Sequence, residues 1–296
     1  MFAAGRDEMH FISLEAARKN RFMFTPYEVA QPSVTGVHVF SDISLEEVSQ
    51  YFDWSPLFWT WELKGSYPSI LQNKSYGEQA REIHREASAL LKQIIQEKRF
   101  QLRAVAGIFP ASSEGDDVVV FDAKDPRRER GWLCFLRQQR ERQGLLNVCL
   151  ADYIAPRAVN LRDHIWAFAV VCHGVEAFAG EFERHADDYQ SIMVKALGDR
   201  FAEALAEYLH KKVRALWGYG ENESLSVQSL INEEYRGIRP APGYPACPDH
   251  TEKGKLWTLL NVEQAIGLSL TENFAMSPAS SVSGFYFAHP DAKYFN

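Results

Sequence analysis

One helical pattern continues from Ala186 to Leu216 without a proline. Its apolar side chains recur mostly at three- and four-residue steps, so they fall on one face of a helix. These side chains are Tyr189, Met193, Ala196, Phe201, Leu205, Leu209 and Val213. Gly198 interrupts the pattern at a cost of about 1 kcal/mol relative to alanine, so two abutting helices are an alternative to one long helix. In either form the segment predicts a long helical element with one buried face.

The remaining patterns predict both helices and strands. Gly77 to Lys98 carries a second apolar stripe at helical spacing, and Ser44 with Glu47 forms a capping-box pattern that opens a short helix. Strands are predicted at residues 104–109, 118–121, 147–154, 165–172 and 281–288, and further helices at residues 225–234 and 256–265. A turn at residues 114–117 predicts a hairpin. The sequence therefore predicts one compact α+β domain, with an antiparallel or mixed sheet flanked by helices.

The first forty residues show little periodicity. Pro26, Pro32 and Gly36 indicate an extended lead-in that drapes over the body of the protein. We therefore divide the chain into a lead-in or linker at residues 1–40 and a domain at residues 41–296. The basic run at residues 127–130 is interpreted as a solvated loop.

Composition excludes several classes of function. The chain has 296 residues, 46% of them hydrophobic, which is enough to build a core without disulfides or metals. The net charge of −7 argues against sequence-independent binding of nucleic acid. No apolar run reaches the roughly 18 residues needed to span a membrane, and charged residues interrupt the first twenty positions. The four cysteines are far apart, which is typical of reduced thiols, and we expect a cytoplasmic protein.

The segment from Arg239 to Pro248 has the most informative local chemistry. Its four prolines, at positions 240, 242, 245 and 248, exclude a regular helix or a central strand. Arg239 offers a planar fork for a carboxylate or phosphate, and Gly243 lets the backbone approach a ligand closely. With Tyr244, these residues could form a cradle for a small zwitterion with a flat ring. Alternatively, the segment is only a structural connector.

Each of the other candidate site residues also has a purely structural interpretation. Asp53 stands where a helix breaks among aromatic residues, and could pair with a ligand cation or cap a turn. Glu203 and Glu207 lie one helical turn apart, which is typical of an ordinary solvated face. Cys247 and His250 include two zinc-ligand types, but no second pair has suitable spacing, so a metal-dependent hydrolase is remote. The common nucleotide-binding and nucleophile motifs are absent from the sequence.

Three motifs resemble one known family, the C-terminal activation domain of cobalamin-dependent methionine synthase, which binds S-adenosylmethionine. They are Asp53-Trp54-Ser55-Pro56-Leu57-Phe58, the run Gly237-Ile238-Arg239-Pro240-Ala241-Pro242-Gly243-Tyr244-Pro245-Ala246-Cys247-Pro248, and Ser281-Val282-Ser283-Gly284 followed by His289-Pro290. The resemblance extends over nearly the whole chain from about residue 40. It implies a bent antiparallel or mixed sheet flanked by helices.

The resemblance also implies a function and a site. Such a domain docks on the cobalamin-binding module and presents S-adenosylmethionine for the reductive methylation of cob(II)alamin, with flavodoxin or a flavoprotein reductase as electron donor. No catalytic side chain and no metal ligand is implied, because cobalt is the nucleophile. Carried over by position, the ligand site comprises Asp53, Glu203, Glu233, Arg239, Ala241, Gly243, Tyr244, Tyr294 and Phe295. Of these, Arg239 would bind the carboxylate, Asp53 the ammonium, and Glu203 or Glu233 the sulfonium.

Two departures from the family keep an alternative open. The chain lacks the D-x-H-x-x-G motif of the cobalamin module and the length for the homocysteine module, where zinc binds, and the folate module. It is therefore expected to be an excised domain or a split subunit, unable to make methionine alone. It also stops at Asn296, where family members continue with a further helix, so the Tyr294 contact is the least secure. The alternative function is a docking cap for the cobalamin module that no longer binds S-adenosylmethionine.

Overall fold

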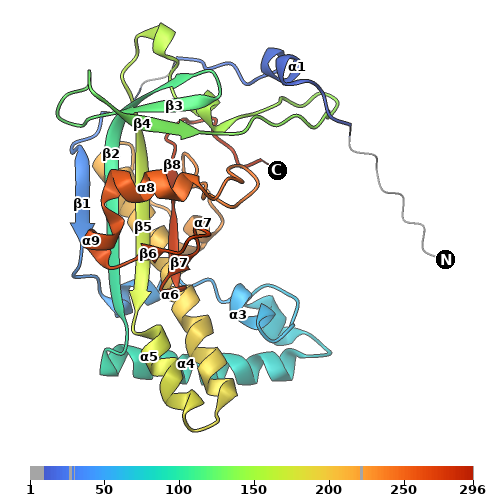
Figure 1. Ribbon diagram of the computed structural model, residues 1–296. Coiled ribbons are helices and arrows are strands. Elements are labelled where there is room, and N and C mark those ends of the chain that lie inside the picture. Colours follow the sequence, from blue (N-terminus) through green and yellow to red (C-terminus); the bar gives the residue numbers. More distant parts are fainter. Residues whose placement is uncertain (1–9, 27–28, 30, 221–222, 296) are drawn as a thin grey trace.

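The computed structural model describes residues 10–26, 29, 31–220 and 223–295. Within these residues the centre is a six-stranded sheet in which all neighbouring strands are antiparallel (Figure 1). The strand order is β4-β3-β2-β5-β8, and β1 also pairs with β2. The strands are β1 (Gly36–Phe40), β2 (Gln101–Glu114), β3 (Asp117–Phe121), β4 (Glu129–Cys134), β5 (Asp163–His173) and β8 (Ser281–Tyr286). The predicted α+β class is confirmed.

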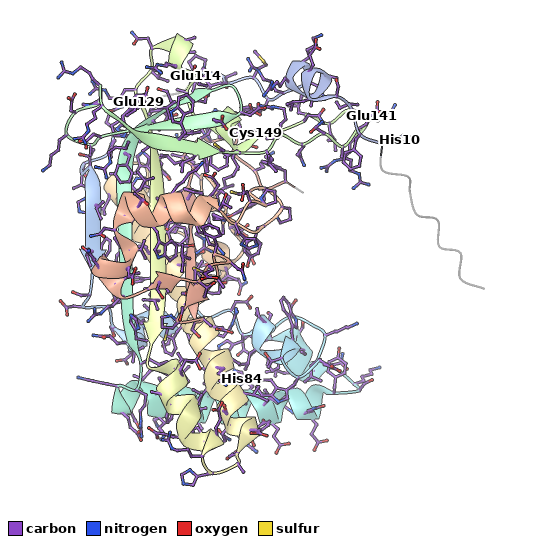
Figure 2. All side chains as sticks on the ribbon, in the orientation of Figure 1. His10, His84, Glu114, Glu129, Glu141 and Cys149 are labelled. Carbon is purple, nitrogen blue, oxygen red and sulfur yellow. The ribbon has the colours of Figure 1, made fainter. Side chains whose placement is uncertain are left out.

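The long strand β2 explains the bend of the sheet. One edge of β2 pairs first with β1, where Ala104 faces Phe40, and then with β3, where Ala111 faces Val120. The other edge pairs with β5 over the register from Gln101–His173 to Ala111–Asp163. Figure 1 shows β3 and β4 turned across one end of the sheet. Figure 2 places Glu114, Glu129 and Cys149 at this end, and His84 at the opposite end.

Strand β5 is buried along nearly its whole length, and its alternate residues belong to two different cores. Trp166, Phe168, Val170 and Cys172 belong to the first core, and Ile165, Ala167, Ala169 and Val171 to the second. Because side chains alternate across a strand, a continuous apolar run requires cover on both faces of the sheet. The sheet is therefore the middle layer of the domain.

Helix α6 (Asp188–Trp217) covers the first face of the sheet and packs on β5 and β8. It is one continuous helix, so the alternative of two abutting helices is wrong. It is joined on this side by α2 (Leu45–Ser49), α3 (Ser55–Trp59), α4 (Gly77–Glu97) and α5 (Val175–Glu183). The predicted cap of α2 is confirmed, since the Ser44 hydroxyl accepts a hydrogen bond from the Glu47 amide at 3.2 Å.

Gly198 is needed where α5 crosses α6. A Cβ at this position would lie 2.6 Å from Val175 Cγ2 and 2.8 Å from the Ser280 hydroxyl. We expect Gly198→Ala to lower the free energy of unfolding by about 1–3 kcal/mol, because the clash outweighs the better helix propensity. The control is Gly180→Ala in α5, where the nearest atom is 3.6 Å from the new Cβ. This variant should raise the free energy of unfolding by about 0.5–1 kcal/mol. Urea unfolding of both variants measures the difference, and a stabilised Gly198→Ala would contradict the prediction.

The second face of the sheet is covered by α8 (Glu252–Leu260) and α9 (Val262–Ile266), and Figure 1 shows α8 lying across the strands. One helix was expected at residues 256–265. Asn261 separates the two helices because its φ of 52° is left-handed and cannot continue an α-helix. The small hairpin of β6 (Ser269–Leu270) and β7 (Met276–Ser277) follows α9.

Three further expectations from the sequence differ from the structure. The strand predicted at residues 147–154 is wrong, because this segment contains the 3₁₀-helix Leu150–Tyr153, closed by a hydrogen bond from the Cys149 amide to the Asp152 carboxylate. The basic run at residues 127–130 is exposed as expected, but its last two residues begin β4. The lead-in is not wholly extended, since it contains α1 (Leu14–Lys19) and β1. Its first nine residues lie outside the described part of the chain, and the division at residue 40 stays a prediction.

The remaining short elements are α7 (Val227–Ile231) and the 3₁₀-helices Ser69–Gln72 and Arg157–Val159. Helix α7 lies within the helix predicted at residues 225–234. None of the helices in the described residues is long and apolar enough to span a bilayer.

Candidate functional site

The start of the proline-rich segment lies along the edge strand β8. Ile238 exchanges two backbone hydrogen bonds with Phe287, of 3.1 and 3.0 Å, and the Pro240 carbonyl accepts a third from the Phe285 amide at 2.9 Å. Proline cannot donate to a strand but its carbonyl can still accept, so an edge position suits it. The backbone that carries Arg239 is therefore attached to the central sheet.

The segment then turns through Gly243, which has a φ of 99°. A Cβ here would lie 2.4 Å from the His250 ring, so only glycine fits both the backbone conformation and the packing. His250 Nδ1 lies 3.1 Å from Lys253 Nζ. The Gly243 turn therefore packs against His250.

Cys247 belongs to the same turn and is buried, and its amide donates to the Tyr244 carbonyl at 2.9 Å. The described residues contain no group of three or more His, Cys, Asp or Glu side chains that could hold a metal. Within this part of the chain Cys247 and His250 take part in the packing of the Gly243 turn.

A cavity of about 380 Å³ opens between this segment, α6 and the C-terminal residues. Seven of the nine predicted site residues line it: Glu203, Glu233, Arg239, Ala241, Tyr244, Tyr294 and Phe295. Phe168 of β5 and Val282 of β8 add apolar surface. Tyr244 is 63% exposed.

A second cavity of about 430 Å³ is also lined by Arg239. It is lined by Asp53, with Tyr51 and Trp59 from the segment around α3, and by residues of α6. Glu203 and Arg239 line both cavities, so the two hollows meet at these side chains. The Asp53 carboxylate also caps the Ser55 amide at 2.9 Å. The structure thus brings eight predicted residues to the two cavities, whereas Gly243 lines neither and acts through the turn.

Arg239 has an ionic partner that the sequence did not predict. Its Nη2 lies 3.2 Å from Oε2 of Glu207, and both side chains are mostly buried. Glu207 is only 6% exposed, so the interpretation of residues 203 and 207 as a solvated face is wrong for Glu207. Spacing of four residues places two side chains on one face of a helix, but it does not say what that face contacts.

Burial and charge act in opposite directions on this pair. Burial disfavours the ionised carboxyl and raises the pKa of Glu207, while Arg239 and Arg214 oppose that rise. Burial also disfavours the charge of Arg239, but Glu207, together with Tyr235, Tyr286 and Tyr294, outweighs this effect, and the pKa of the guanidinium is raised. Arg239 is therefore a fixed positive charge between the two cavities.

Glu233 and Tyr294 complete the site. The Tyr294 hydroxyl accepts a hydrogen bond from the Arg239 amide at 2.8 Å and is also bonded to the Glu233 side chain. Burial raises the pKa of Glu233 and raises that of Tyr294 to about 12. Four carboxyl groups, at positions 53, 203, 207 and 233, and two guanidinium groups, at positions 200 and 239, thus line the two cavities. Such an arrangement suits a small ligand that carries one carboxylate and more than one positive charge.

Comparison with known proteins identifies the family. The model of the vitamin B12 dependent methionine synthase activation domain matches residues 44–296. The chain belongs to this family. It is also similar to a crystal structure of the MetH reactivation domain bound to AdoHcy, with 47% sequence identity and a TM-score of 0.90. The match covers 96% of this chain and 89% of that chain. The resemblance found in the sequence and the fold class that it implied are both confirmed.

Proposed function

We propose that this activation domain binds S-adenosylmethionine across the two joined cavities. The observation that carries the proposal is the buried Arg239 guanidinium at their junction, with carboxyl groups on both sides. The related MetH reactivation domain was crystallised with AdoHcy, the demethylated form of the same ligand. A ligand that carries a carboxylate, an ammonium and a sulfonium has a net positive charge, which complements a site rich in acids.

Each proposed contact follows from the charge of the side chain. Arg239 binds the ligand carboxylate through a charge-assisted hydrogen bond. Asp53, in the second cavity, pairs with the ammonium, and Glu203 or Glu233 stabilises the sulfonium. The backbone around Ala241 binds the adenine or ribose, and the Gly243 turn keeps that backbone in place.

The proposed role in catalysis is positioning. Cobalamin, carried on a partner module of methionine synthase, supplies the cobalt that accepts the methyl group. The residues of this chain hold the donor and need no general base or nucleophile. The proposed reaction also needs an electron donor, such as flavodoxin or a flavoprotein reductase. We further propose that the domain does not make methionine alone. The four free cysteines support a cytoplasmic location.

Calorimetric titration of S-adenosylmethionine into the purified protein tests this proposal. We expect saturable binding with one ligand per chain. Folded protein that binds no ligand would contradict the proposal and favour the docking cap. Tight binding of zinc, measured in the same protein by metal analysis, would instead favour the hypothesis of a metal-dependent hydrolase.

A further inference from the structure

We propose that Glu207 is a positioning residue, which holds the Arg239 guanidinium in the orientation that binds the ligand carboxylate. This inference rests on the proposed binding of S-adenosylmethionine. It adds a residue that was not among the predicted contacts and that acts through another side chain.

Arg239 is held at both ends. Its backbone amide donates to the Tyr294 hydroxyl at 2.8 Å, and the residues before and after it are hydrogen-bonded to Phe287 and to Phe285 of β8, respectively. At the far end of the side chain, Nη2 lies 3.2 Å from the Glu207 carboxylate. The side chain between these points has several rotatable bonds, so the backbone anchor alone does not orient the guanidinium. Glu207 supplies the second point of attachment.

The ion pair leaves one part of the guanidinium for a ligand. Nη1 of Arg239 is buried and has no hydrogen-bond partner among the described residues. A guanidinium has five donors in a fixed plane, and a carboxylate on one side fixes the direction of the others. Glu207 therefore determines where Nη1 points.

Glu207 is itself well placed to act as a rigid support. It lies in the middle of α6, which packs on the central sheet, and it is nearly fully buried. The charges that act on it are Arg239 and Arg214, which favour its ionised form, and Glu203 and Glu233, which disfavour it. Without Glu207, the buried guanidinium would lack its counter-charge whenever no ligand is present.

Glu223 offers a matched control. Its carboxylate pairs with Nε of Arg214 at 2.9 and 3.0 Å, and the Arg214 side chain is fully buried. This pair also involves α6, but Glu223 lines neither cavity. Glu223→Gln therefore weakens a comparable buried ion pair without touching Arg239.

Calorimetry on Glu207→Gln, Glu207→Ala and Glu223→Gln with two ligands tests the proposal. The ligands are S-adenosylmethionine and its decarboxylated form, which keeps the sulfonium and the ammonium. We expect Glu207→Ala to weaken binding of S-adenosylmethionine more than about tenfold, and Glu207→Gln, which keeps an acceptor, to weaken it less. Binding of the decarboxylated ligand should change less than about twofold in both variants, and Glu223→Gln should leave both ligands unaffected.

The outcomes separate this inference from the proposed function. If wild-type protein does not bind S-adenosylmethionine, the proposed function fails. If wild type binds and both Glu207 variants bind equally well or more tightly, Glu207 does not position Arg239. Equal weakening of both ligands would also overturn the inference. It would indicate a general structural role, or a direct contact between the ammonium that both ligands carry and Glu207, which lines the second cavity. Should Glu207→Ala not fold, the Glu207→Gln measurements decide alone.

Discussion

Arg239→Ala is expected to weaken the binding of S-adenosylmethionine by about 1.5–3 kcal/mol, roughly 10- to 150-fold. The substitution removes the positive charge at the junction of the two cavities and leaves the four carboxyl groups that line them, at positions 53, 203, 207 and 233. It also leaves Glu207 buried without its ion-pair partner. Since burial already raises the pKa of Glu207, the carboxyl would take up a proton more readily in this variant.

Two further variants test whether the effect of Arg239→Ala is specific to the guanidinium at this position. Arg239→Lys keeps the charge but not the planar fork, so we expect an affinity between those of wild type and Arg239→Ala. Arg236→Ala removes a nearby arginine that donates to the Ala288 carbonyl and lines neither cavity. It should keep wild-type affinity. If folded Arg239→Ala binds as tightly as wild type, the ligand site lies elsewhere in the protein.

The site could be predicted from the sequence where its chemistry is local. The segment from Arg239 to Pro248 gathers an arginine, a glycine and prolines in consecutive positions, and these residues determine its backbone. Asp53 and Glu203 were assigned through the family resemblance, because no local pattern connects them with Arg239. The sequence analysis noted Glu207 only because it lies one helical turn after Glu203. Its burial and its ion pair with Arg239 could not be predicted, because Arg239 lies in another part of the chain. A contact between residues that are far apart in the sequence can be identified only from the tertiary structure.

The same limit applies to the fold. Strand β5 was predicted because a strand buried on both faces needs a continuous apolar run. Strand β4 was missed because it begins with the charged residues Glu129 and Arg130, which were assigned to a solvated loop, and its apolar run is only Trp132 to Cys134. The segment at residues 147–154 is as apolar as a strand, yet a hydrogen bond of its own Asp152 closes it into a 3₁₀-helix. Side-chain hydrogen bonds of this kind compete with regular structure and are not visible in hydrophobic periodicity.

Arg137 joins this 3₁₀-helix to the hairpin of β2 and β3. Its fully buried side chain binds both oxygens of Asp152 at 2.7 and 2.8 Å, and its Nε donates to Asp116 at 2.8 Å. A fourth hydrogen bond goes to the Asn147 carbonyl. Asp116 is also paired with Arg18 of α1, at 2.9 Å. One guanidinium thus ties together segments that are far apart in the sequence.

Arg137→Ala is therefore expected to lower the free energy of unfolding by about 3–5 kcal/mol, the usual effect of breaking a buried ion pair by removing one partner. Asp152 would stay buried with only its cap of the Cys149 amide, and Asp116 would keep only Arg18. Urea unfolding followed by circular dichroism measures the change. None of these partners lines either cavity, so the folded variant should still bind S-adenosylmethionine with wild-type affinity.

The control for Arg137→Ala is Arg127→Ala. Arg127 pairs with Asp125 at 3.0 Å, but its side chain is 90% exposed, and a solvated pair contributes about 0–1 kcal/mol. The contrast isolates the effect of burial, because each substitution removes an arginine bonded to an aspartate. A loss of less than about 1 kcal/mol in Arg137→Ala would mean that the cost of desolvating the three charges nearly cancels their attraction. In that case the 3₁₀-helix would owe its position to the apolar side chains of Leu150 and Tyr153 rather than to the ion pair.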